Sequence, residues 1–205
     1  MSSADGKPGN RRELTKIQNR QVILAAARQV FAEMGFGAAT VRDIIRATPL
    51  ASGTFYNYFK SKEEVYQAIR DEVALAIRPH LRETRSQAAT LEDFISGSFR
   101  TFFEFVAQSR MDFRHLRPAT GSRLRMDTPE VIAGFEELRA DLEAAIARGL
   151  FPDVDSDFLM ASIVGVAFEI SERMLMREAD DAAGAAAFAT ALFLGGVRAL
   201  PGKTT

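Results

Sequence analysis

Residues 36–66 read FGAATVRDIIRATPLASGTFYNYFKSKEEVY, and most of the reading of this chain follows from them. Two short helical periods flank a tight turn, and an aromatic and basic run follows at the start of a further helix. Thr48-Pro49 marks the turn, because proline disfavours helical geometry in the preceding residue and has no amide hydrogen to donate. This order of elements is the outline of a helix-turn-helix DNA reader.

The residues before the turn have clear helix signals. Apolar residues at helical spacing predict an amphipathic helix over residues 13–34. Gly35 is expected to end it in a left-handed conformation that lets Phe36 fold back onto the helix. Thr40 is expected to begin a second helix, because its hydroxyl can accept from a free backbone amide and Asp43 suits the positive helix end.

The residues after the turn predict a short third helix and the start of a fourth. The third helix is expected over residues 52–58, with Phe55 and Phe59 facing inward and the polar side chains nearer solvent. The pattern Ser61-x-x-Glu64 is a capping box for the fourth helix.

Charge separates this part of the chain from the rest. Residues 1–62 carry ten lysines and arginines against four acidic residues, a net charge of +6. The other residues carry 16 basic and 23 acidic side chains, a net charge of −7. The near-neutral total therefore combines a basic reader with an acidic body, and a basic helical module with tyrosines and hydroxyls suits phosphate contacts and groove entry.

Two segments carry a family resemblance: ILAAARQVFAEMGFGAATVRDI, residues 23–44, and GTFYNYFKSKEEVYQAI, residues 53–69. Their order, spacing and residue types resemble the TetR family of one-component bacterial transcription regulators over about residues 20–69. The resemblance implies phosphate contacts from Thr40 and Arg42, contacts to bases or phosphates from Ser52, Gly53, Thr54 and Asn57, and phosphate contacts from Tyr56, Tyr58 and Lys62.

The turn departs from the family pattern. Where the family commonly has Ala-Gly-Val-Ser-Lys, residues 48–52 read TPLAS. Pro49 cannot take the positive φ that glycine permits, so a different turn path is expected. Ala51 replaces a hydroxyl cap, at a cost of about 1 kcal/mol unless Ser52 takes over. A plain packing role for the motif is the alternative reading.

Composition excludes several other classes. The chain has 205 residues, 47% of them hydrophobic, and no cysteine, so disulfides, thiolate nucleophiles and thiolate metal sites are excluded. Its two histidines lie in no HExxH, GxSxG or P-loop pattern. We therefore expect no enzyme, cofactor or metal site. Lacking an apolar run of about 18 residues or a leader pattern, the chain is expected to be cytoplasmic, with no membrane partner.

The remaining signals are helical and predict an all-α chain, because no alternating strand pattern competes with them. Pro79 is expected to kink or interrupt the fourth helix. The predicted domains are a mobile tail over residues 1–12, the helix-turn-helix domain over 13–62, and a helical ligand-binding and dimerisation domain over 63–205. The helices expected after the motif run from Ser61 to about Arg85, Thr90 to Gln108, Thr128 to Gly149, Asp155 to Arg177 and Asp181 to Leu200.

The sequence of residues 63–205 predicts an apolar effector site. Twelve of the sixteen phenylalanines lie there, more than one packing face requires, although each alone fits an ordinary core. Arginines clustered over residues 110–125 suggest an acidic, lipid-like ligand such as a fatty acid or acyl-CoA, with a solvated basic loop as the alternative. The predicted ligand residues are Phe99, Phe102, Phe103, Val106, Met111, Arg114, Phe135, Leu138, Met160, Val164 and Phe168.

The last two helices predict self-association. Residues 158–170 are apolar almost all round, and the final helix is rich in alanine and glycine, which lets helices approach closely. Two copies would form a four-helix interface and present two readers to a pseudo-palindromic operator. A packed monomer core is the alternative.

Together these features predict a dimeric TetR-like regulator, a repressor released from operator DNA by a hydrophobic small molecule. The fourth helix is expected to couple ligand to reader, since it begins at Lys62 and ends in the body. Control by a protein partner, or activation instead of repression, are the alternatives.

Overall fold

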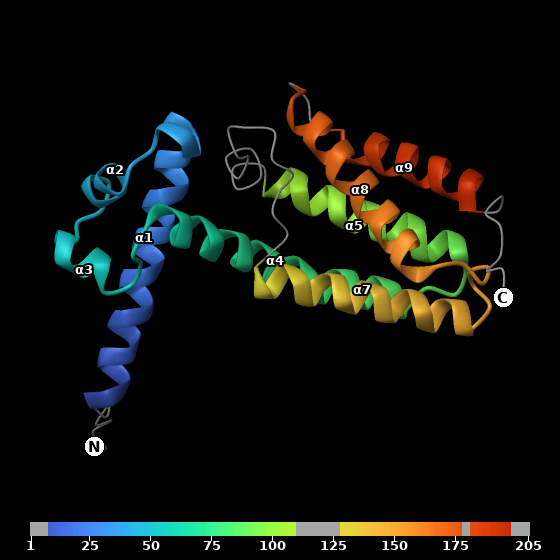
Figure 1. The fold of residues 1–205 in the computed structure, drawn as a ribbon, viewed down its shortest axis with the longest axis horizontal. Coiled ribbons are helices and arrows are strands. Elements are labelled where there is room, and N and C mark those ends of the chain that lie inside the picture. The colour runs from blue at the N-terminus through green and yellow to red at the C-terminus, as the bar shows by residue number, and fades with distance from the viewer. Residues whose placement is uncertain (1–7, 110–127, 178–180, 198–205) are drawn as a thin grey trace, which may run out of the picture. The chain divides into compact units, whose positions relative to one another are not determined.

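The computed structural model describes residues 8–109, 128–177 and 181–197, and within them every regular element is an α-helix (Figure 1). The predicted all-α fold is confirmed. The described residues form two compact units, one through Arg70 and one from Asp71 onward, so that α4 (Lys62–Ser86) contributes to both. The domain boundaries predicted at residues 12 and 62 stay predictions. None of the described helices is both long and apolar enough to cross a membrane.

The first unit holds α1 (Pro8–Ala38), α2 (Val41–Arg46), α3 (Ser52–Tyr56) and the start of α4. α1 begins five residues earlier than predicted, because proline is well suited to a first helical turn.

A bend near the end of α1 is set by Gly35. Its φ of 76° and ψ of 152° lie in a region open essentially to glycine alone, and not in the left-handed helical region that we predicted. The helix is therefore bent at Gly35 and continues to Ala38. The predicted return of Phe36 is confirmed, since its ring lies 5.4 Å from that of Phe31 and 4.6 Å from that of Tyr66.

The second unit contains the rest of α4 with α5 (Leu91–Gln108), α7 (Pro129–Ala147), α8 (Ser156–Leu175) and α9 (Ala182–Val197). We expected Pro79 to kink or interrupt α4. It lies inside the helix and does not interrupt it. Thr90 caps α5 with Asp93 in a reciprocal pair, and Asp155 accepts two backbone amides at the start of α8.

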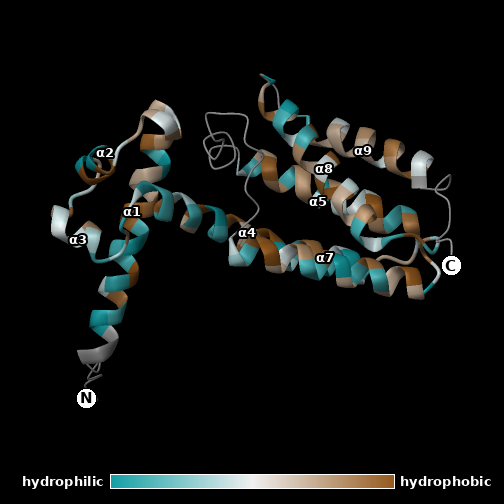
Figure 2. Ribbon diagram, in the orientation of Figure 1, coloured by the Kyte–Doolittle hydropathy of each residue, from teal (hydrophilic) through white to brown (hydrophobic). Residues whose placement is uncertain are grey.

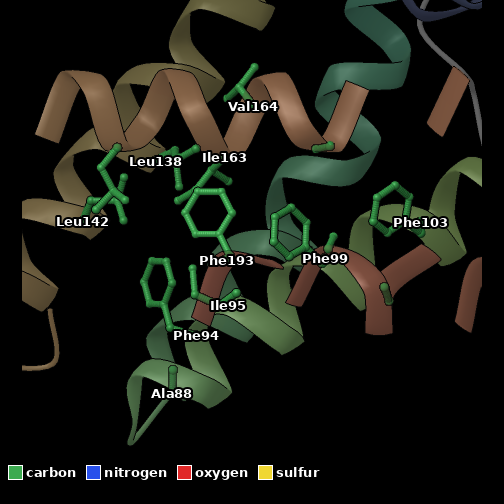
Figure 3. Close-up of a cluster of buried hydrophobic side chains, with 14 of the residues drawn as sticks. Ala88, Phe94, Ile95, Phe99, Phe103, Leu138, Leu142, Ile163, Val164 and Phe193 are labelled. Carbon is green, nitrogen blue, oxygen red and sulfur yellow. The ribbon is translucent and has the colours of Figure 1, made fainter. Parts of the chain in front are cut away.

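One apolar core joins α5, α7, α8 and α9. Figure 3 shows Phe193 of α9 between Phe99 of α5 and Ile163 of α8. The rings of Phe99 and Phe193 are 5.7 Å apart in an edge-on arrangement, which aromatic pairs prefer. In Figure 2, brown apolar residues alternate with teal polar ones along α5, α7 and α8 in the second unit.

Charged side chains join α4 to α7. Arg78 pairs with Glu130 and Glu137, and Arg85, only 5% exposed, places its Nε 2.6 Å from the Asp141 carboxylate. The hydrogen bond from Arg78 is the main reason that the pKa of Glu137 lies below its usual value. These pairs fix the register of the two helices.

Helices α4 and α5 approach closely at Gly97. A β-carbon there would lie 2.7 Å from the Thr84 Cγ2 methyl, while the Thr84 and Thr101 hydroxyls are 3.1 Å apart. We expect Gly97→Ala to lower the free energy of unfolding by about 1 kcal/mol, because the overlap outweighs the gain in helix propensity.

The matched background for this test is Thr84→Ser, which removes the methyl and keeps the hydroxyl. There Gly97→Ala should be neutral or stabilising by up to about 1 kcal/mol in urea denaturation. An equal cost in both backgrounds would contradict the steric explanation.

Candidate DNA-binding surface

The turn between α2 and α3 is held by Thr48. Its hydroxyl donates to the Ile45 carbonyl at 2.8 Å and accepts from the Leu50 amide at 3.2 Å. Positive φ values occur among the described residues only at Gly35 and Gly149, so this turn forms without a left-handed residue. The absence of a positive φ at Pro49 is as expected, and a path different from that of the family's turn stays a prediction.

Thr40 begins α2 as predicted, and the N-terminus of the helix is closed by a capping box between Thr40 and Asp43. The Thr40 hydroxyl accepts from the Asp43 amide at 3.3 Å, and the Thr40 amide donates to the Asp43 carboxylate at 3.0 Å. The Thr40 hydroxyl also donates to that carboxylate, and this bond is the main cause of the lowered pKa of Asp43. A phosphate contact from Thr40 would compete with Asp43 for that proton, whereas Arg42 beside it is exposed.

Helix α3 presents polar side chains over a single buried aromatic residue. Phe55 is 1% exposed, and Phe59 just beyond the helix is 5% exposed, so both point inward as predicted. Ala51 occupies the cap position without a side-chain hydrogen bond, which confirms the expected loss of a hydroxyl cap. The predicted contact residues Ser52, Gly53, Tyr56 and Asn57 are exposed, and Thr54 and Tyr58 are half-buried.

Lys62 makes contacts that the sequence did not predict. Its ammonium donates to the carbonyls of Phe36 and Ala39, both at 2.8 Å, and lies 4.7 Å from the centre of the Phe36 ring. The end of α1 is thereby tied to the start of α4. The phosphate contact predicted for Lys62 remains a prediction, and it would draw on the same ammonium hydrogens.

Replacing Lys62 with methionine is expected to lower the free energy of unfolding by about 2 kcal/mol, because carbonyls at the α1 terminus lose a charged donor. Urea denaturation measures the loss, and Lys60→Met, at an exposed neighbour, should change stability by less than about 0.5 kcal/mol. A similar small change for Lys62→Met would contradict the capping role. An unchanged salt dependence of DNA binding in this variant would contradict the phosphate contact.

Arg20 also makes a contact that the sequence did not predict. Its guanidinium carbon lies 5.6 Å from the centre of the Phe59 ring, a cation–π arrangement that connects α1 to the end of the α3 segment. Such a contact links residues far apart in sequence, and no local pattern predicts it.

Most of the predicted effector residues come together in the second unit. Five are buried members of its core: Phe99, Phe103, Val106, Leu138 and Val164. Four are partly buried against that core: Phe102, Phe135, Met160 and Phe168. The rings of Phe102 and Phe168 make an edge-on contact at 5.7 Å. Met111 and Arg114 lie outside the described residues.

Comparison with known proteins gives a consistent result for the first unit. Residues 23–69 match the profile of bacterial regulatory proteins of the tetR family. An uncharacterised HTH-type transcriptional regulator from Haemophilus influenzae is 32% identical over 113 residues, which are 54% of this chain. The match spans 55%, or about half, of that relative's length.

Solved structures extend the likeness to most of the chain. The fatty acid degradation regulator FadR from Bacillus halodurans is 25% identical, with a TM-score of 0.73 over 88% of this chain and 96% of its own. FadR from Bacillus subtilis, solved with stearoyl-CoA, is 22% identical, with a TM-score of 0.70 over 88% and 99%. At that identity the second likeness concerns the fold alone.

Proposed function

Because this chain belongs to the tetR family of bacterial regulatory proteins, we propose that it represses transcription as a homodimer on a palindromic operator and leaves DNA when a hydrophobic small molecule binds. Its family makes it a transcriptional regulator. We propose that it acts in the cytoplasm, where it can bind its operator.

The exposed polar face of α2 and α3 carries the DNA-binding part of this proposal. Hydroxyl, amide and phenol groups from Ser52, Asn57 and Tyr56 stand at the surface, while Phe55 anchors the helix beneath them. Short polar side chains on a docked helix suit base edges and phosphates in a major groove.

A salt titration tests DNA binding directly. A duplex selected by the protein from a random-sequence library is titrated at several salt concentrations, and log affinity should fall steeply with log salt, by about 0.9 for each neutralised phosphate. A flat dependence, or failure to select any duplex, would reject the proposal. A promoter reporter carrying the selected site then separates repression from activation.

Aromatic residues in the second unit support a lipid-like effector. Phe102, Phe135 and Phe168 are partly buried beside the core, where an acyl chain would find apolar contacts. The names of two structural relatives point the same way, since one is a fatty acid degradation regulator and the other was solved with stearoyl-CoA.

An acyl-CoA series of increasing chain length tests the effector. The melting temperature, measured by fluorescence, should rise with acyl chain length up to that of a matching ligand. The same ligand should release the selected duplex. Absence of any shift across the series would reject a lipid effector and leave DNA binding standing.

Exposed apolar side chains on α8 and α9 support the dimer. Phe158 of α8 is 76% exposed and Phe188 of α9 is 64% exposed, and Leu192 lies one turn further along α9. Exposed small residues on α9, such as Ala187, Ala191 and Gly195, permit close helix contact across a two-fold axis.

Helix α4 supports coupling between ligand and DNA, because it is shared by the two units. Its first part carries Lys62 at the end of α1, and its second part carries Arg78 and Arg85, which pair with α7. A ligand that displaces α7 would act on α4 through these pairs.

A further inference from the structure

Residues 11–18 of α1 extend beyond the buried part of the helix. Every side chain from Arg11 to Gln18 is exposed, and the first fully buried residue of the helix is Ile23. Leu14 and Ile17 are each 54% exposed, although both are large and apolar. A helical segment without packing is marginal in water, so this extension contributes little to the stability of the unit.

One face of the extension is basic. At about 100° per residue, Arg12, Lys16 and Arg20 fall within an arc of about 80°. The same arc continues along the helix to Ile23 and Ala27, which pack inward against the other helices of the unit. The basic face of α1, defined here by Arg12, Lys16 and Arg20, therefore extends the side of α1 that carries α2 and α3.

A direct contact connects this face with the recognition segment. The guanidinium of Arg20 lies against the ring of Phe59, which follows α3 in the chain between Tyr58 and the exposed Lys60. In Figure 1 the N-terminal part of α1 runs past α3 within the first unit. Lys16 and Arg12 follow Arg20 along the helix at successive steps of about 6 Å.

The charge of the extension fits a polyanion. Residues 11–20 carry four basic side chains and one acid, Glu13, for a net charge of +3. A DNA strand presents one phosphate for about each 3.4 Å of helix axis, so side chains about 6 Å apart can reach separate phosphates of one backbone.

We propose that Arg12 and Lys16 bind backbone phosphates beside the groove that α3 enters, which makes the N-terminal extension of α1 a second DNA contact. This inference rests on the proposed function, and it concerns affinity and orientation, because phosphate contacts position a protein and carry no direct sequence information.

The test compares Arg12→Gln/Lys16→Gln with the wild type in the full-length chain, using a fluorescein-labelled duplex selected by the wild type. The slope of log affinity against log salt should become shallower by about 1.8 for each protomer on the DNA, at 0.9 per lost phosphate contact. Sequence preference, measured with single-base variants of the duplex, should stay the same.

Arg11→Gln is the matched control, because Arg11 is exposed on the same helix but lies about 100° or more from each residue of the basic face. It removes one charge from the same segment and should leave the slope unchanged. Circular dichroism should give equal melting temperatures for all variants, since the substituted side chains are exposed.

Two outcomes would overturn the inference. If the wild type binds with a steep slope and the double variant retains that slope, or if Arg11→Gln lowers it as much per charge, α1 makes no specific contact while the proposed function stands. If the wild type binds no duplex, both proposals fail together.

Discussion

Replacing Asp141 with alanine is expected to lower the free energy of unfolding by about 3 kcal/mol. The substitution removes the carboxylate 2.6 Å from Nε of Arg85 and leaves a guanidinium that is only 5% exposed without its partner. This loss lies at the lower end of the range for breaking a buried ion pair, because Glu137 still attracts Arg85. Urea denaturation followed by circular dichroism at neutral pH measures it.

Two further variants make the test specific. Glu136→Ala removes one partner of the surface pair with Arg139 on the same helix and should cost less than about 1 kcal/mol. Arg85→Met with Asp141→Leu removes both charges and should recover most of the loss, since an apolar pair needs no desolvation of ions. If Asp141→Ala costs no more than Glu136→Ala, the buried pair does not stabilise the unit.

Replacing Phe188 with lysine is expected to convert the proposed dimer to a monomer. Phe188 is 64% exposed on α9, and in a two-fold interface both copies would bring the new charge to the same contact. Burying charges without partners costs several kcal/mol, so the dimer dissociation constant should rise at least about 100-fold. Sedimentation velocity at micromolar concentration measures the change, and affinity for a palindromic duplex should fall with it.

Ile132→Lys serves as the control for the same chemical change elsewhere. Ile132 is a large apolar residue on α7 with 45% exposure, outside the α8 and α9 surface. That variant should sediment like the wild type. A monomeric wild type would contradict the proposed dimer, and loss of the dimer in both variants would show that the effect is not specific to α9.

The helix starts that the sequence predicted well are those with local causes. Thr40 and Thr90 were expected to begin helices, and each forms a reciprocal cap with the aspartate three residues later, Asp43 and Asp93. The start of α1 was placed too late, because the apolar period does not extend to its exposed first turns. Apolar residues recur at helical spacing where one face of a helix is buried, and an exposed helical extension has no such face.

The contacts that the sequence did not predict join residues far apart in the chain. Lys62 reaches Phe36 across 26 positions, and Arg78 and Arg85 reach α7 across 52 to 59 positions. Arg78 and Arg85 are seven residues apart and so share one face of α4, yet nothing in the sequence says which helix lies opposite that face. Such pairing depends on tertiary packing.

The effector residues illustrate a different difficulty. Phe99 and Phe103 were chosen as ligand contacts and lie in the buried core, stacked at 6.0 Å. Phenylalanine at helical spacing serves a core and a binding pocket equally well, so sequence separates them poorly. The exposure of Tyr56 and Asn57 was easier to predict, because polar side chains on a short helix are mostly found at the surface, while their DNA contacts stay a prediction.

The turn at Pro49 affects the unfolded chain as well as the folded one. Proline restricts the backbone before folding begins, whereas the glycine common in this family leaves it freer. Since the native turn needs no positive φ, this restriction is compatible with the folded geometry. By this effect alone, ordering the turn loses less conformational entropy than a glycine-bearing turn would, a difference of about 0.4–1 kcal/mol in favour of the folded reader.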